Sequence, residues 1–107
     1  MSDFINIGAL DEFPDEGMRQ VMVRGEPLGI YRVGESVYAI HDVCTHEEAF
    51  LTEGEFDADD CEVECPRHGS RFNVANGDVR ILPATKPVAT YQVKLQEGSV
   101  LVGPQKV

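Results

Sequence analysis

The sequence has few basic residues, few cysteines and no long apolar run. Only 9 of its 107 residues are Lys or Arg against 19 that are Asp or Glu, so the formal net charge is −10. A surface this acidic repels phosphate-rich partners, which excludes nucleic-acid binding as a function. Nowhere do about 18 consecutive apolar residues occur, so we expect no membrane span.

The cysteine count and the first residues bear on the compartment. Residues 1–6 show no basic region followed by an apolar stretch, which is the pattern of a secretory signal. Three cysteines are an odd number, which argues against a secreted disulfide framework and favours metal binding in a reducing compartment. We therefore expect a cytoplasmic protein.

Helical periodicity is also missing, because no apolar pattern of period 3.6 survives for more than about two turns. Short alternating runs separated by Gly, Pro, Asn and Asp predict an all-β protein, a small antiparallel sandwich or barrel, in one domain over residues 1–107. The predicted strands are Phe4–Ile7, Met18–Val23, Pro27–Val33, Ser36–His41, Glu62–Glu64, Arg71–Asn73, Ala89–Gln96 and Ser99–Val102. Turns are predicted at 24–26, 34–35, 76–77 and 97–98, and single helical turns at 9–13 and 47–52.

Two short pairs of cysteine and histidine stand out from this background. Cys44 and His46 flank Thr45, Cys65 and His68 flank a Pro-Arg dipeptide, and residues 47–64, eighteen in all, separate the pairs. Both pairs follow predicted strands, and loops there can bring four side chains to one point. Two thiolates and two imidazoles form a complete ligand set that selects late first-row metals over magnesium or calcium.

Two other interpretations compete with a redox metal centre. For either pair alone, a buried cysteine beside a satisfied histidine is an equal alternative, but two pairs at ligand spacing weaken it. Structural zinc also accepts two thiolates and two imidazoles. Zinc fingers, however, generally pair like with like and place at least about two residues between paired ligands. Here Cys and His alternate, and only Thr45 separates the first pair.

The motif resembles that of the Rieske iron-sulfur proteins, in which Cys-x-His is followed, after a longer spacer, by Cys-x-x-His. The Thr, Pro and Gly residues around the ligands match as well. The chain length, the β-rich prediction and the segment 83–87 further resemble the small Rieske-type ferredoxins of bacterial aromatic-ring-hydroxylating dioxygenase systems. The resemblance implies a Rieske fold with a cluster-binding subdomain at approximately 42–82, formed by two loops. It also implies one 2Fe-2S cluster, in which Cys44 and Cys65 hold one iron and His46 and His68 hold the other.

Departures from the respiratory branch of that family are informative. That branch carries one more cysteine in each loop, joined in a disulfide, where this chain has Ala49 and Arg67. It also places a serine and a tyrosine whose hydroxyls donate to the cluster sulfurs, and here Ser70 keeps its position while the tyrosine is replaced by Phe72. Losing one hydroxyl donor lowers the expected reduction potential toward about −150 mV. Capping of the loop backbone is an equal alternative for Ser70.

The resemblance implies a soluble electron carrier with no catalysis of its own. It would accept electrons from an NAD(P)H-dependent flavin reductase and deliver them to the terminal oxygenase of an aromatic-ring dioxygenase, as a monomer in transient, salt-sensitive contacts. His46 and His68 would form the surface through which the electron leaves. Alternatives are a small Rieske-like subunit of another reductase, such as nitrite reductase, and a zinc-stabilised β binding module. An oxygenase is least favoured, because its iron site needs two further histidines and only His41 is left.

Four features outside the ligand set have simpler expectations. Pro83 and Pro87 resemble the proline-containing loop that covers the cluster in the family. The acidic run at 53–64 is interpreted as a solvated loop rather than a docking site. Cys61 fits no ligand position and is expected to be structural or exposed, and His41 is expected to be structural.

Overall fold

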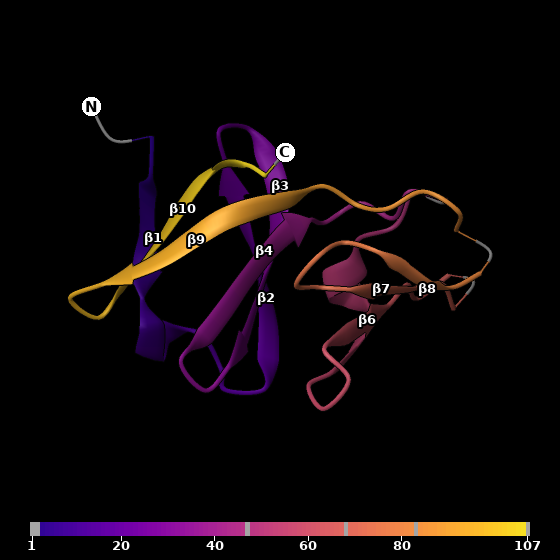
Figure 1. The fold of residues 1–107 in the computed structure, drawn as a ribbon, viewed down its shortest axis with the longest axis horizontal. Coiled ribbons are helices and arrows are strands. Elements are labelled where there is room, and N and C mark those ends of the chain that lie inside the picture. The colour runs from indigo at the N-terminus through magenta and orange to yellow at the C-terminus, as the bar shows by residue number, and fades with distance from the viewer. Residues whose placement is uncertain (1–2, 47, 68, 83, 107) are drawn as a thin grey trace.

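Two antiparallel sheets lie side by side in the computed structural model, which describes residues 3–46, 48–67, 69–82 and 84–106 (Figure 1). The large sheet has the strand order β1-β10-β9-β4-β3-β2 and the small sheet the order β5-β6-β7-β8. The large-sheet strands are β1 (Ile5–Ala9), β2 (Gly17–Val23), β3 (Glu26–Val33), β4 (Ser36–His41), β9 (Thr90–Gln96) and β10 (Ser99–Gln105). The small-sheet strands are β5 (Glu55–Asp57), β6 (Glu62–Glu64), β7 (Arg71–Asn73) and β8 (Val79–Ile81).

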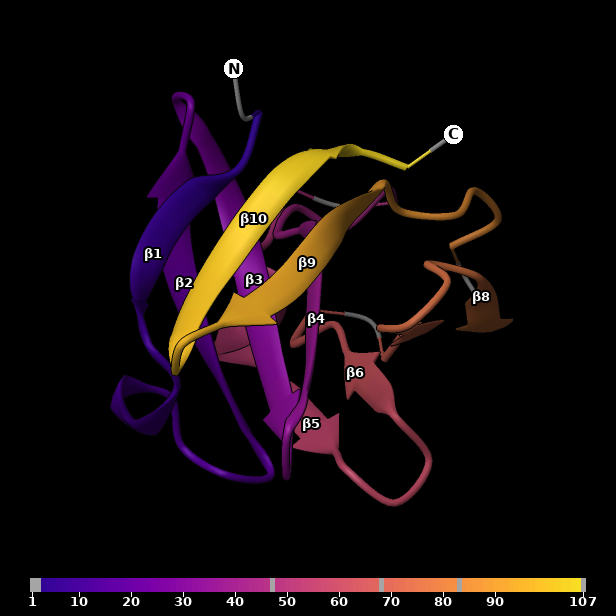
Figure 2. The ribbon, with the colours of Figure 1, turned by 60° about the vertical axis from the view of Figure 1, so that its left-hand side comes forward.

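Tight hairpins build the large sheet. Arg24 and Gly25 between β2 and β3, like Glu97 and Gly98 between β9 and β10, all have positive φ angles of 51° to 79°. Two successive residues with positive φ form the turn whose twist matches that of paired strands. Strands β2 and β3 consequently pair without a shift from Gly17 opposite Arg32 to Val23 opposite Glu26. Figure 2 shows β10 and β9 crossing in front of β3 and β4 as this sheet curves round.

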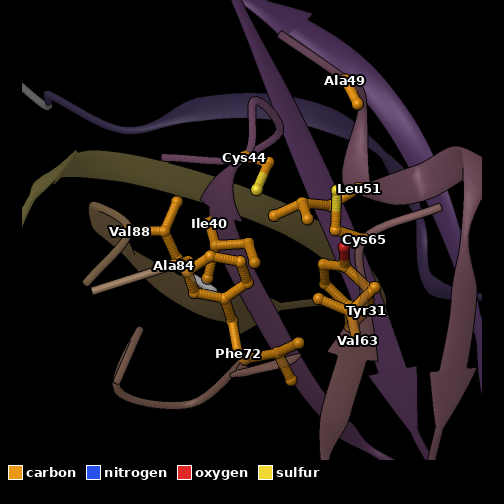
Figure 3. Packing of buried hydrophobic residues seen from close by; sticks show 11 residues of the cluster. Tyr31, Ile40, Cys44, Ala49, Leu51, Val63, Cys65, Phe72, Ala84 and Val88 are labelled. Carbon is orange, nitrogen blue, oxygen red and sulfur yellow. The ribbon is translucent and has the colours of Figure 1, made fainter. Parts of the chain in front are cut away.

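The core is divided into two apolar clusters. One lies within the curved large sheet and consists of Phe13, Val23, Leu28, Ile30, Ala39, Val100 and Val102. The other joins the two sheets, because Tyr31 and Ile40 of the large sheet pack with Val63 and Phe72 of the small sheet (Figure 3). The chain leaves the large sheet after β4, forms the small sheet, and returns to it at β9. The small sheet and its loops therefore form a compact excursion from one side of the large sheet.

The all-β prediction is confirmed, and all eight predicted strands are present with shifts of at most three residues at their ends. Two strands were missed, β5 and β8, each only three residues long. Treating the acidic run 53–64 as a loop was wrong at Glu55–Asp57, which forms β5 and pairs with the predicted strand Glu62–Glu64. Their carboxylates face outward while Phe56 and Val63 pack inward, and that pairing overrides the charge pattern.

The two predicted helical turns fared differently. The first is present as a 3-10 helix at Leu10–Glu12. The second was placed too early, because the turn forms at Leu51–Glu53, where the Leu51 side chain is buried in the inter-sheet cluster. Glu47, at the start of the predicted turn, lies outside the described residues. Among the residues that the structure describes, no helix is long and apolar enough to cross a membrane.

Candidate metal centre

The first ligand pair lies in a tight loop after β4. The Cys44 amide donates a hydrogen bond to the carbonyl oxygen of Ala49 at 2.9 Å, which closes the loop over residues 44–49. Val43 and Phe50 extend the closure as an isolated antiparallel bridge. Within this loop Cys44 is buried, whereas His46 is exposed. The loop thus directs one expected ligand inward and the other toward solvent.

The second pair begins directly after β6 and has the same kind of closure. The Cys65 amide donates to the carbonyl oxygen of Ser70 at 2.7 Å, and the Gly69 amide donates to the carbonyl oxygen of Cys65 at 3.2 Å. Gly69 has φ of +77°, a backbone conformation that glycine adopts without strain. Cys65 is buried, and His68 lies outside the described residues.

The fold brings the two thiols, 21 positions apart in sequence, into one buried cluster. Figure 3 shows both side chains at the same end of this cluster, beside Leu51 and above the rings of Tyr31 and Phe72. In the described part of the chain no group of three or more His, Cys, Asp or Glu side chains is arranged around a single metal ion. A two-iron cluster requires only two protein ligands on each iron, so the pair of thiols is the relevant unit.

A third segment ties the two ligand loops together. The Ser70 hydroxyl oxygen accepts a buried hydrogen bond of 3.0 Å from the Ala84 amide, and the Thr45 hydroxyl donates to the Lys86 carbonyl oxygen at 2.7 Å. The Ser70 hydroxyl thus bonds to backbone, as one alternative expected, but to the distant segment at Ala84 rather than to its own loop. The Ser70 hydroxyl proton stays available for a second bond. Pro83 lies outside the described residues, and Pro87 is exposed on this segment.

Three positions distinguish this chain from the respiratory branch, namely Ala49, Arg67 and Phe72. Ala49 is buried and Arg67 is exposed, and both border a groove of about 740 Å³ between the two ligand loops. Phe72 is fully buried and contributes no hydroxyl group. All three cysteines lie in the described part of the chain, and none forms a disulfide. The loops are therefore joined by hydrogen bonds and packing rather than by a covalent bridge.

The two residues expected to be structural behave as such. His41 Nε2 lies 3.0 Å from the Glu26 carboxylate across the β3–β4 pairing. Cys61 is partly buried against the inter-sheet cluster, and burial, followed by the nearby Glu62 charge, raises the pKa of its thiol. A thiol with a raised pKa is a poor nucleophile and a poor metal ligand at neutral pH.

Sequence reasoning missed one residue of this region, Asp42. Its carboxylate is fully buried just before the first ligand loop, and its own carbonyl oxygen accepts a hydrogen bond from the Leu51 amide at 2.7 Å. A single Asp between a strand and a ligand motif is an ordinary turn residue, so nothing in the pattern indicates burial.

Comparison with known proteins identifies the class to which this site belongs. Residues 3–92 match the family described as the Rieske [2Fe-2S] domain, and the chain belongs to that family. Within the family, it is 42% identical over 98 residues to the ferredoxin CarAc of Metapseudomonas resinovorans, covering 92% of this chain and 90% of that protein. Other curated relatives are ferredoxin components of aromatic dioxygenase systems.

Solved structures agree with that placement. The ferredoxin of carbazole 1,9a-dioxygenase from Nocardioides aromaticivorans IC177 is 37% identical, with a TM-score of 0.93 over 96% of this chain and 99% of that one. A complex of reduced oxygenase and oxidized ferredoxin in carbazole 1,9a-dioxygenase matches with a TM-score of 0.90 and 37% identity, over 100% of this chain and 99% of the other. The expected Rieske fold is confirmed.

The donor set also fits the family's 2Fe-2S cofactor. Two thiols that share a buried, largely apolar pocket can both bind one ferric ion as thiolates, because the metal charge compensates the cost of burying them. An exposed imidazole on the same loop as Cys44 fits the more solvent-facing ligand position. The described residues are therefore compatible with a Rieske cluster.

Proposed function

We propose that this chain passes single electrons from an NAD(P)H-dependent flavin reductase to the terminal oxygenase of an aromatic-ring dioxygenase. The observation that carries the proposal is that Cys44 and Cys65, from two separate loops, are buried in the same cluster. The chain also belongs to the Rieske family and resembles dioxygenase ferredoxins along nearly its whole length. The cluster supplies reversible uptake of one electron without a change in bonding to any substrate.

In this scheme Cys44 and Cys65 would hold one iron, and His46 and His68 would hold the other. The cysteines lie in the inter-sheet core, which keeps water away from the thiolates. His46 is exposed, so its ring edge would be accessible to a partner, and we assign the electron exit to this surface. The protein's own contribution is to position the ligands and to set the potential, as in other cofactor proteins.

We further propose that the partners bind transiently and that the chain acts as a cytoplasmic monomer, a single domain whose residues 42–82 form the cluster-binding part. The chain itself would carry electrons and would not convert a substrate. The net charge of −10 should accelerate encounter with partners that carry basic patches. The rate of electron delivery should consequently fall as salt is added, because surface charges separated by more than about 10 Å are screened at 0.1 M salt.

The test is the visible spectrum of the purified protein, with iron and acid-labile sulfide counted per chain. We expect about two of each. Substitution His46→Cys should shift the spectrum toward that of an all-cysteine cluster and lower the potential, because an anionic thiolate replaces a neutral imidazole. The matched control is His41→Cys, which changes a histidine paired with Glu26 and should leave the spectrum unaltered. A colourless protein containing zinc would contradict the proposal, as would equal responses from the two variants.

A further inference from the structure

A fully buried carboxylate lies next to the first ligand loop. Asp42 is 0% exposed and stands two positions before Cys44. Its Oδ2 accepts hydrogen bonds from Gln20 Nε2 at 2.8 Å and from the Thr52 hydroxyl at 2.5 Å. Its Oδ1 accepts one from the Thr52 amide at 2.9 Å. These contacts join the large sheet, the ligand loop and the 3-10 turn at Leu51–Glu53.

The contacts define the hydrogen-bonding role of this group. The Gln20 amide nitrogen and the Thr52 backbone amide can only donate, so the Asp42 carboxyl group acts as an acceptor on both oxygens. Three hydrogen bonds from two residues therefore converge on this buried carboxyl group. No ion pair links Asp42 to another residue in the part of the chain that is described. The result is a fully buried carboxyl group with no cationic partner among the described residues.

The Asp42 side chain is tightly packed against Gly29 and Tyr31. A Cβ atom at Gly29 would lie 3.1 Å from Asp42 Oδ1 and 3.0 Å from the hydroxyl oxygen of Tyr31. That hydroxyl is buried and has no hydrogen-bond partner among the described residues. Burial, together with the Asp42 charge, raises the pKa of Tyr31, which keeps the phenol neutral. The Tyr31 hydroxyl and the Asp42 carboxyl group therefore share one closely packed site.

We propose that Asp42 acts as a fixed internal charge that lowers the reduction potential of the centre, with Gln20 as its partner at the surface. The inference rests on the ligand set proposed above. Reduction would add one negative charge to the cluster that Cys44 is proposed to hold, and the chain between Asp42 and Cys44 spans at most about 7 Å. Repulsion between like charges at this range is strong, because solvent and salt screen buried groups little. Asp42 is a positioning and tuning residue, since it does not itself bind the metal.

The central test is Asp42→Asn, followed by redox titration with the visible spectrum as readout. The asparagine can keep the network, because the Thr52 hydroxyl can turn to accept and the Gln20 amide can flip. Removing the charge should raise the potential and change the equilibrium constant for electron exchange with a fixed mediator by about tenfold, the effect of a unit charge roughly 10 Å away at an effective dielectric constant of about 20.

A matched control removes the same charge from the surface of the same loop. Glu48 is exposed and lies four positions after Cys44. Glu48→Gln should shift the potential less than Asp42→Asn does, and its shift should vanish at high salt, whereas the shift of Asp42→Asn should persist. Equal shifts with equal salt dependence would overturn the assignment of a special role to the buried charge.

A second pair of variants leaves Asp42 in place and keeps the test valid if Asp42→Asn fails to fold. Gln20 is an exposed β2 residue whose side chain reaches Asp42. Gln20→Lys brings a cation to the carboxylate and should raise the potential, while Gln20→Leu breaks the same hydrogen bond without adding charge and should not. If both raise it equally, the effect is structural and the proposal fails. A wild-type protein without iron and sulfide would instead refute the proposed function, before any variant is titrated.

Discussion

The two sheets achieve their stability in different ways. The strands of the large sheet are five to eight residues long, and the cluster that they enclose is entirely apolar. The four strands of the small sheet have three residues each, and their cluster includes the thiols of the two proposed ligands Cys44 and Cys65. One half is an ordinary β structure, whereas the other is a short-stranded scaffold for two loops.

The comparison indicates that folding and metal binding are coupled in only one half. Isolated hairpins are marginally stable in water, so three-residue strands need further support. In the small-sheet half that support comes from single hydrogen bonds, such as those accepted by Ser70 and donated by Thr45, and from ligation of a metal. Metal-binding energy then becomes folding energy for this half. The following experiments test that division.

The largest effect is expected from removal of the iron. Hydrogen exchange of the apoprotein should show the Cys44 and Cys65 amides losing protection by at least about 100-fold, because their loops open locally. Amides in the pairing between β2 and β3 should keep most of theirs, since the register there is continuous over seven residue pairs. Equal loss of protection in both halves would refute the proposed division.

Two glycines, Gly54 and Gly34, differ in how much space surrounds them. A Cβ atom at Gly54 would overlap the carbonyl oxygen of Glu64, the residue before Cys65, whereas one at Gly34 would meet nothing within 4 Å. Gly54→Ala should therefore destabilise the protein by about 3 kcal/mol and reduce its iron content. Gly34→Ala, at φ of +62°, should cost only the backbone strain of about 1 kcal/mol and leave the iron content unchanged. Urea unfolding and iron analysis of both variants give the comparison, and equal iron loss would contradict it.

The same division explains what could be predicted from the sequence. The long strands were placed within three residues of their ends, because alternation and turn residues are local signals. Strands β5 and β8 were missed, since three residues carry too little pattern and their pairing depends on neighbours in the small sheet. The two cysteines were singled out by their spacing, their neighbouring residues and the family resemblance, and the fold places both thiols in one buried cluster. Buried Asp42 was not identified, because its partners Gln20 and Thr52 are 22 and 10 positions away.

Ser70→Ala should give the next largest effect. It leaves the buried Ala84 amide without an acceptor, which we expect to cost about 1–3 kcal/mol and to accelerate loss of the cluster on heating. Thr45→Val is the control, because it removes a hydrogen bond at an exposed position, where water can replace the lost partner, and should cost about 0.5 kcal/mol. Thermal unfolding followed in the visible spectrum measures both. A larger effect from Thr45→Val would mean that the segment 84–87 is held mainly from its other end.

The smallest expected effect comes from replacing one arginine in each sheet and comparing how the loss of stability depends on salt. Arg71 donates to Glu64 at 3.1 Å and to Glu62 at 3.4 Å on the outer face of the small sheet. These hydrogen bonds raise its pKa, so it stays charged, but solvent and salt weaken pairs of this kind. Arg32 instead donates to the backbone oxygen of Phe13 at 2.9 Å in the large sheet. Arg71→Met should lower the unfolding temperature slightly at low salt and not at all at 1 M salt, whereas the loss in Arg32→Met should be independent of salt, because its acceptor carries no net charge.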